Sequence, residues 1–203
     1  AKQDAALQEA LMAAKEQVAQ NPQSVESQLG LALAHARLDD FSNEIAALRR
    51  ALKLADEAPI IKAMLAEALS RQADGQVTLP ARALIQEVLA VLPNEPRALF
   101  MAGLAAYQDE GFEQAISIWM QLAKTAPVPS PWPALAQRNI QLAAEEGGIS
   151  LPEEWRLSLD EAEVSAIASA SSEDQREMIL AMVEGLEARL QETADDAQGW
   201  QRL

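Results

Sequence analysis

Apolar side chains recur at helical spacing from the start of the chain. Between positions 4 and 20 they form one face of a helix, and Asn21-Pro22 ends it because proline cannot continue a helix. Similar stripes return in segments 25–56, 59–93, 96–127 and 134–146, separated by Pro or Gly. The chain is rich in Ala and Leu, which are good helix formers. The pattern predicts an all-α protein.

The segment 96–127 carries the most specific pattern, PRALFMAGLAAYQDEGFEQAISIWMQLAKTAP. Gly103 and Ala115 are small where two antiparallel helices must approach closely, and Trp119 is the large side chain that fills the wedge between them. Pro127 stops the second helix because it lacks an N–H. This spacing matches the tetratricopeptide (TPR) repeat. One such hairpin leaves an apolar face uncovered, so it requires stacked neighbours.

Two more degenerate repeats precede this hairpin. In the first, residues 25–56, Ala32 stands where Gly103 does, and Glu44 replaces the small residue at the Ala115 position. The second, residues 59–93, carries a loop about three residues longer than a tight turn, after which Thr78 is a candidate helix cap. We therefore predict a TPR-like solenoid of antiparallel helical hairpins with capping helices.

The chain divides into three parts by pattern. Residues 1–146 form a TPR-like domain with a leading helix, three repeats and a closing helix. Residues 147–171 read as a linker with a short helix around 159–167. Residues 172–203 begin with an amphipathic helix and then realign with residues 22–31, so this segment either starts a further repeat or folds back as a cap.

Charge and composition exclude several functions. The net charge is −15, and a nucleic-acid-binding protein instead needs clustered Lys and Arg. The chain has no Cys and one His, so it offers no Cys–His pair, and no Gly-rich phosphate loop follows a strand. We expect no enzymatic activity, no metal site and no cofactor. His35 lies on the inward face of its helix, where we expect it to be packed and hydrogen-bonded rather than catalytic.

The leading helix with its Asn-Pro turn, the insertion in the second repeat, and the sequences ALFMAGLAAYQDEGFEQAISIW and SPWPALAQRNI together resemble the CcmI/CycH/NrfG family. The likeness covers residues 5–143. It implies a TPR subunit of bacterial cytochrome c maturation that captures the C-terminal helix of apocytochrome c and presents it for haem attachment. It also implies haem-ligation complex subunits as partners and a periplasmic location. No run of 18 apolar residues is present, so we expect a membrane tether only through an anchor absent from this chain.

The geometry of the family assigns the peptide-binding groove to the first helix of each repeat. We expect the groove to bind an amphipathic helix. The apolar face of that helix would contact Leu33, Phe100, Leu104 and Tyr107. Its acidic side chains or terminal carboxylate would meet Arg37 and Arg71. Equally, both arginines read as ordinary solvated helix residues. Carried onto this sequence, the groove positions are Leu29, Leu33, Arg37, Ala63, Glu67, Arg71, Phe100, Leu104, Tyr107 and Gln108.

An alternative reading is a structural scaffold or oligomerisation module. Residues 144–203 hold 15 acidic and four basic side chains. In this reading the acidic C-terminal helix docks in the groove of its own chain or of a neighbour. An exposed apolar helix at 172–193 favours self-association. A monomer with an empty groove favours ligand capture.

Overall fold

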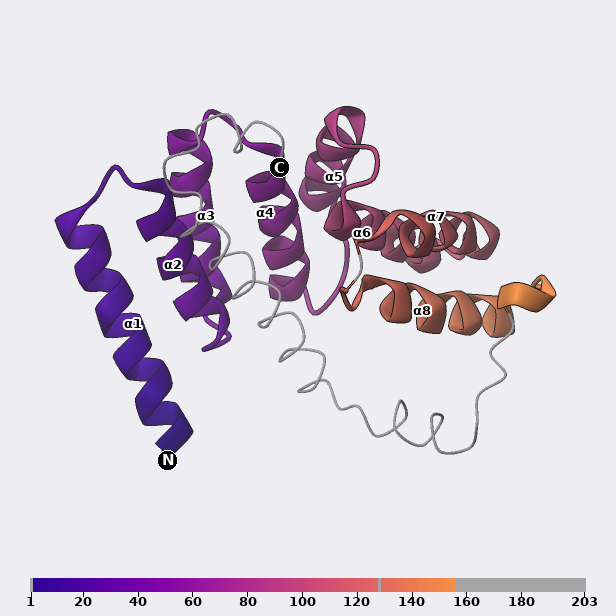
Figure 1. Ribbon diagram of the computed structural model, residues 1–203, viewed down its shortest axis with the longest axis horizontal. Helices are drawn as coiled ribbons and strands as arrows, with labels where there is room; N and C mark the ends of the chain where they lie inside the picture. The colour runs from indigo at the N-terminus through magenta and orange to yellow at the C-terminus, as the bar shows by residue number, and fades with distance from the viewer. Residues whose placement is uncertain (1, 128, 156–203) are drawn as a thin grey trace. The chain divides into compact units, whose positions relative to one another are not determined.

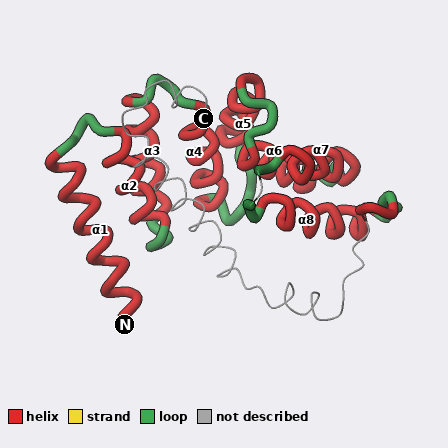
Figure 2. The backbone as a smooth tube through the Cα atoms, viewed as in Figure 1, coloured by secondary structure: helices red, strands yellow, loops and turns green. Residues whose placement is uncertain are grey.

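The computed structural model describes residues 2–127 and 129–155, with side chains from Ala5 onward. This part of the chain is helical and contains no strand (Figure 1, Figure 2). The elements are α1 Lys2–Gln20, α2 Val25–Ala36, α3 Phe41–Leu54, α4 Pro59–Gln72, α5 Leu79–Val91, α6 Pro96–Gln108, α7 Phe112–Thr125, α8 Trp132–Gly147 and the 3-10 helix η1 Glu153–Trp155.

The chain forms two compact units. The first comprises residues 1–127 and 132–149, and it contains α1 to α8. Of the second, the described residues are 129–131 and 150–155, which include η1, a short element within the expected linker. The helices expected at 159–167 and 172–193 lie outside the described residues. Among the described helices, none is both long enough and apolar enough to cross a membrane.

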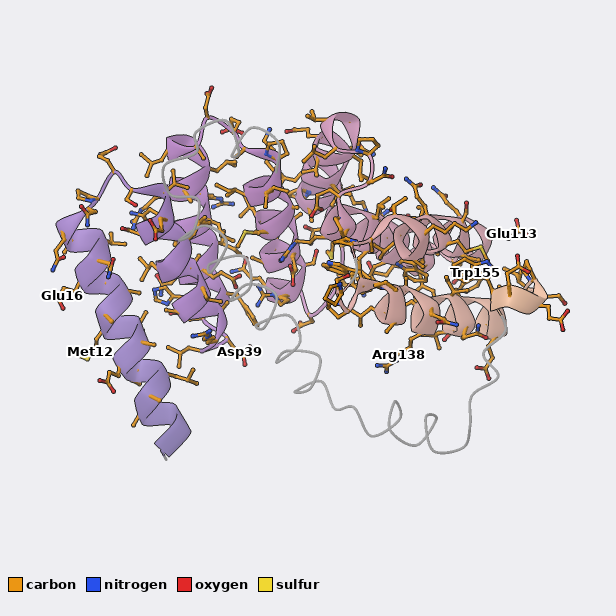
Figure 3. All side chains as sticks on the ribbon, viewed as in Figure 1. Met12, Glu16, Asp39, Glu113, Arg138 and Trp155 are labelled. Atoms are coloured by element: carbon orange, nitrogen blue, oxygen red, sulfur yellow. The ribbon has the colours of Figure 1, made fainter. Side chains whose placement is uncertain are left out.

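Within the first unit, consecutive helices pack as antiparallel hairpins. The pairs are α2 with α3, α4 with α5, and α6 with α7, and each hairpin contacts the next along the chain (Figure 1). Helix α1 packs against α2, and α8 packs against α7 and α6. The side chains of Met12 on α1 and Arg138 on α8 point out of the array (Figure 3). The prediction of an all-α TPR-like solenoid is confirmed.

Each hairpin turns in the same way. Two or three residues after the end of the first helix stands an acidic residue in the left-handed backbone conformation: Asp39 with φ 52°, Asp74 with φ 54° and Glu110 with φ 60°. The N–H of the following residue donates to a carbonyl five positions back, as from Gly111 to Ala106 at 2.9 Å. This is the Schellman arrangement, which satisfies the last carbonyls of a helix. Three similar turns explain why the hairpins repeat despite their divergent sequences.

Side-chain caps fix where the helices begin. The Asp40 carboxylate accepts a hydrogen bond from the Asn43 N–H at 3.3 Å, and Glu95 accepts one from the Ala98 N–H at 2.5 Å. The Thr78 hydroxyl accepts from the Ala81 N–H at 3.5 Å, as the sequence predicts. These caps satisfy N–H groups that have no partner within their own helix.

The third hairpin closes around Trp119, whose side chain is fully buried. A Cβ atom built on Gly103 would lie 2.3 Å from Nε1 of Trp119, so the indole occupies the space that any other residue at 103 would fill. The indole N–H donates to the Phe100 carbonyl at 3.1 Å. The expected packing of Gly103 against Trp119 is therefore present. Trp132, at the start of α8, is also buried, with its ring centroid 5.7 Å from that of Phe100.

Candidate functional site

The predicted groove positions form stripes on the first helix of each hairpin, because residues three or four apart share one face of a helix. We call them the first-helix stripes: Leu29 and Leu33 on α2, with Arg37 directly after that helix; Ala63, Glu67 and Arg71 on α4; Phe100, Leu104 and Tyr107 on α6. Leu33, Ala63 and Glu67 are buried, and the other members are half-buried.

The α6 stripe is mainly aromatic and has a rigid support. The Phe100 ring lies between two indoles, 6.5 Å from Trp119 and 5.7 Å from Trp132. The Tyr107 ring packs 6.0 Å from Trp119 and 5.6 Å from Phe112. Phe100 and Tyr107 are half-buried, so each combines a fixed position with an accessible edge. Such rings bind apolar side chains at little conformational cost.

The polar groups at the end of α6 are committed to neighbouring elements. The Tyr107 hydroxyl donates to Glu146 of α8, and this bond, with smaller effects of burial and of the carboxylate charge, raises the pKa of Tyr107 to about 12. The Gln108 amide donates to the Gly75 carbonyl at 2.8 Å, and its oxygen accepts from the Val77 N–H at 2.8 Å. Gln108 therefore holds the loop between α4 and α5.

Four charged side chains from three helices form one cluster. The Arg71 guanidinium donates through Nη2 to Oε1 of Glu44 on α3 at 2.5 Å, and its Nε lies 4.0 Å from Oε1 of Glu67. Glu67 also accepts a hydrogen bond from Arg97 of α6. The Arg71 guanidinium lies 5.7 Å from the centroid of the Phe41 ring. The pair of Glu67 with Arg97 shows that the α4 and α6 stripes are adjacent.

Burial dominates the electrostatics of Glu44. Its side chain is 6% exposed, whereas that of Arg71 is 31% exposed. Desolvation raises the pKa of Glu44 from 4.5 to about 7, although the charge of Arg71 acts in the opposite direction. Its Oε2 atom has no hydrogen-bond partner among the described residues. Burial therefore favours the protonated form of this carboxyl more than that of an exposed glutamate.

Sequence reasoning missed Glu44 and Arg97 as members of this site. Glu44 could have been recognised from the sequence. It replaces a small residue at a packing position, and a carboxylate that is buried there requires a cation as its partner. Arg97 lies three residues before Phe100 and shares its helix face. The partnership of Glu67 with both Arg71 and Arg97 depends on how α4 and α6 pack, which spacing along one helix does not reveal.

The arrangement has the features of a binding surface. The described residues contain no group of three or more His, Cys, Asp or Glu that could hold a metal ion. His35 is buried, and its Nδ1 lies 3.0 Å from Oδ2 of the α3 cap Asp40, which gives it the structural role expected from sequence. Half-buried apolar side chains and a partly exposed arginine on neighbouring helices are typical of a surface for an amphipathic helix.

Comparisons with known proteins agree with this architecture. Residues 2–131 match the family model described as the TPR domain of cytochrome c-type biogenesis protein H. Cytochrome c-type biogenesis protein CycH of Bradyrhizobium diazoefficiens is 33% identical over 167 residues, which cover 82% of this chain and 43% of that protein. CycH of Rhizobium meliloti is 33% identical over 172 residues, covering 84% and 44%.

A third, smaller relative is named as a subunit of a different assembly. The formate-dependent nitrite reductase complex subunit NrfG of Escherichia coli O157:H7 is 33% identical over 112 residues, which cover 55% of this chain and 57% of that protein. The chain spans less than half the length of the two CycH proteins. The family match spans most of the described helical array, and the chain belongs to the family of cytochrome c-type biogenesis protein H TPR domains.

Proposed function

We propose that this chain is the peptide-binding module of a cytochrome c maturation protein, and that it captures the C-terminal helix of apocytochrome c and presents it for haem attachment. The observation that carries the proposal is the set of first-helix stripes, which combines half-buried apolar side chains on α2 and α6 with the partly exposed Arg71 on α4. The names of the CycH relatives give the process, cytochrome c biogenesis.

The ligand helix binds through two kinds of contact. Its apolar face, repeating every three to four residues, packs on the half-buried Phe100, Leu104 and Tyr107 and on the small exposed part of the buried Leu33. Its acidic side chains or terminal carboxylate meet Arg37 and Arg71, because a guanidinium matches a carboxylate with paired donors. The α6 stripe supplies apolar contact area, and the arginines fix the direction of the bound helix.

The cellular setting belongs to the same proposal. A module that hands an apocytochrome to haem ligation works beside the subunits of the haem-ligation complex. We place it in the periplasm, tethered to the inner membrane in the full-length protein. The relative named as a subunit of the formate-dependent nitrite reductase complex is consistent with work inside a larger assembly.

The direct test is a calorimetric titration of the chain with synthetic C-terminal helices of c-type apocytochromes. Saturable binding that discriminates against a peptide of scrambled sequence supports the proposal. Sedimentation of the unliganded chain tests the scaffold alternative in the same preparation. A chain that self-associates and binds neither peptide contradicts peptide capture.

Replacing Arg37 and Arg71 together with Ala is expected to weaken binding of the matching peptide at least tenfold. The reason is that a hydrogen bond between charged groups contributes about 1.5 to 3 kcal/mol, and about 1.4 kcal/mol is tenfold in affinity. The measurement is the peptide Kd by calorimetry. A matched control replaces Arg49 and Arg50, which are exposed on α3 and carry the same total charge. An equal loss of peptide affinity in both double variants would show that the effect comes from long-range charge, and it would contradict specific contacts of Arg37 and Arg71.

A further inference from the structure

Arg71 stands between a buried carboxylate and the surface. Its Nη2 atom bonds Oε1 of Glu44 at 2.5 Å, yet 31% of the Arg71 side chain is exposed against 6% of that of Glu44. Part of the Arg71 side chain is therefore accessible, although its guanidinium is bonded to Glu44. A ligand carboxylate that approaches the α4 stripe meets a cation that already has a partner.

The charges around Glu44 indicate that Glu44, rather than Glu67, is the carboxylate that a ligand displaces from Arg71. Glu67 accepts a hydrogen bond from Arg97, so the second carboxylate of the cluster has its own cation. The charged groups that face Glu44 are Arg71 and Glu67 from α4 and Arg97 from α6. On α2, His35 is directed at Asp40 instead. Glu44 thus depends chiefly on Arg71 for its charge, in a site where Glu67 repels it.

We infer, on the basis of the proposed function, that a carboxylate of the bound peptide replaces Glu44 as the partner of Arg71, and that Glu44 takes up one proton from solvent as this happens. The exchange leaves the charge of the cluster balanced, since one carboxylate arrives ionised and another becomes neutral. No covalent bond other than the O–H bond on Glu44 forms. Capture of an acidic peptide is thereby coupled to proton uptake.

The direction of the pH dependence follows from linkage. In the free chain Glu44 loses its proton as pH rises through about 7. Without its arginine, the buried carboxyl holds the proton to higher pH, so the complex binds more protons than the free chain. Peptide affinity then falls as pH rises above 7, by at most about tenfold per pH unit for one proton. Below that pH the affinity levels off.

The experiment uses the full chain and a peptide of about 15 residues, four turns of helix, taken from the C-terminus of a c-type apocytochrome and free of histidine. Calorimetry at pH 6.0 to 8.5, in phosphate and in Tris, counts the protons taken up because the two buffers have different ionisation heats. We expect uptake of close to one proton at pH 8. An amidated peptide, and one with its acidic side chains replaced by amides, show which carboxylate is the source.

Two variants assign the proton. Glu44→Gln mimics the protonated form, so it should bind the peptide at pH 8.5 as tightly as the unsubstituted chain does at pH 6, with no proton uptake. Histidines also titrate near neutrality, and His35 is the single histidine of the chain, so His35→Gln serves as the control that keeps the pH dependence.

The outcomes distinguish the hypothesis of proton coupling from that of peptide capture. Peptide binding with no proton uptake by the unsubstituted chain, or an unchanged pH profile in Glu44→Gln, overturns the proton coupling and leaves peptide capture intact. Absence of peptide binding at every pH overturns the proposed function itself. The buffer comparison needs no substitution, so a variant that fails to fold does not prevent the test.

Discussion

Gly103→Ala is expected to lower the free energy of unfolding by about 3 kcal/mol, as overpacking of a full core and loss of a buried hydrogen bond do together. The new methyl group would lie 2.3 Å from Nε1 and 2.6 Å from Cε2 of Trp119, an indole with no exposed surface. Trp119 must shift, which weakens its bond to the Phe100 carbonyl. Urea unfolding followed by circular dichroism measures the change.

The same variant tests the link from core to site, because the rings of Phe100 and Tyr107 both pack on Trp119. Its peptide affinity should fall as well. Gly30→Ala on α2 is the matched control, since a Cβ there has no heavy atom within 4 Å. That change should stabilise the chain by up to about 1 kcal/mol, as for alanine over glycine in a helix. Equal stability of the two variants would contradict the wedge role of Trp119.

Glu44→Gln is expected to stabilise the folded chain at pH 8 by about 3 kcal/mol. The folded-state pKa of Glu44 is raised from 4.5 to about 7, and each pKa unit corresponds to about 1.4 kcal/mol. The folded state binds the extra proton between these values, so the contribution of Glu44 to stability is present below pH 4.5 and is lost as pH rises through 7. Gln stays neutral and avoids this loss.

The measurement is urea unfolding at pH 4, 6 and 8, which gives the difference in unfolding free energy between Glu44→Gln and the unsubstituted chain. The difference should be small at pH 4 and should level off above pH 7. The control is Glu113→Gln, which removes an exposed carboxylate from the first turn of α7 and should change stability by only a few tenths of a kcal/mol. A Glu44→Gln variant that is less stable at pH 8 would show that the ion pair with Arg71 outweighs burial.

The sequence predicts the hairpins well because their determinants are steric and local. Gly103 and Trp119 lie sixteen positions apart in one hairpin, and the size of each limits the other. The closing helix spans 132–147, and the sequence pattern alone places it at 134–146. Such features need no knowledge of how one hairpin sits on the next.

The charged part of the site was harder to predict, because it is shared between hairpins. Arg71 was expected to face a ligand, and the structure adds its bond to Glu44 from the preceding hairpin. Gln108 was expected on the same surface, and the structure shows it bonded to the α4–α5 loop. Repeat spacing places a residue on a helix face, but the angle between hairpins decides which groups from two repeats meet.

The contacts that cross from one hairpin to the next have a consequence for how the array opens. Glu44 and Arg71 join the first hairpin to the second, while Glu67 with Arg97 and the amide of Gln108 join the second to the third. In repeat arrays, cooperativity grows with the strength of such nearest-neighbour interfaces. Loss of one hairpin would break these bonds and expose the apolar residues that it shares with its neighbour in one core, so partly unzipped forms are disfavoured and we expect the three hairpins to melt in one concerted step.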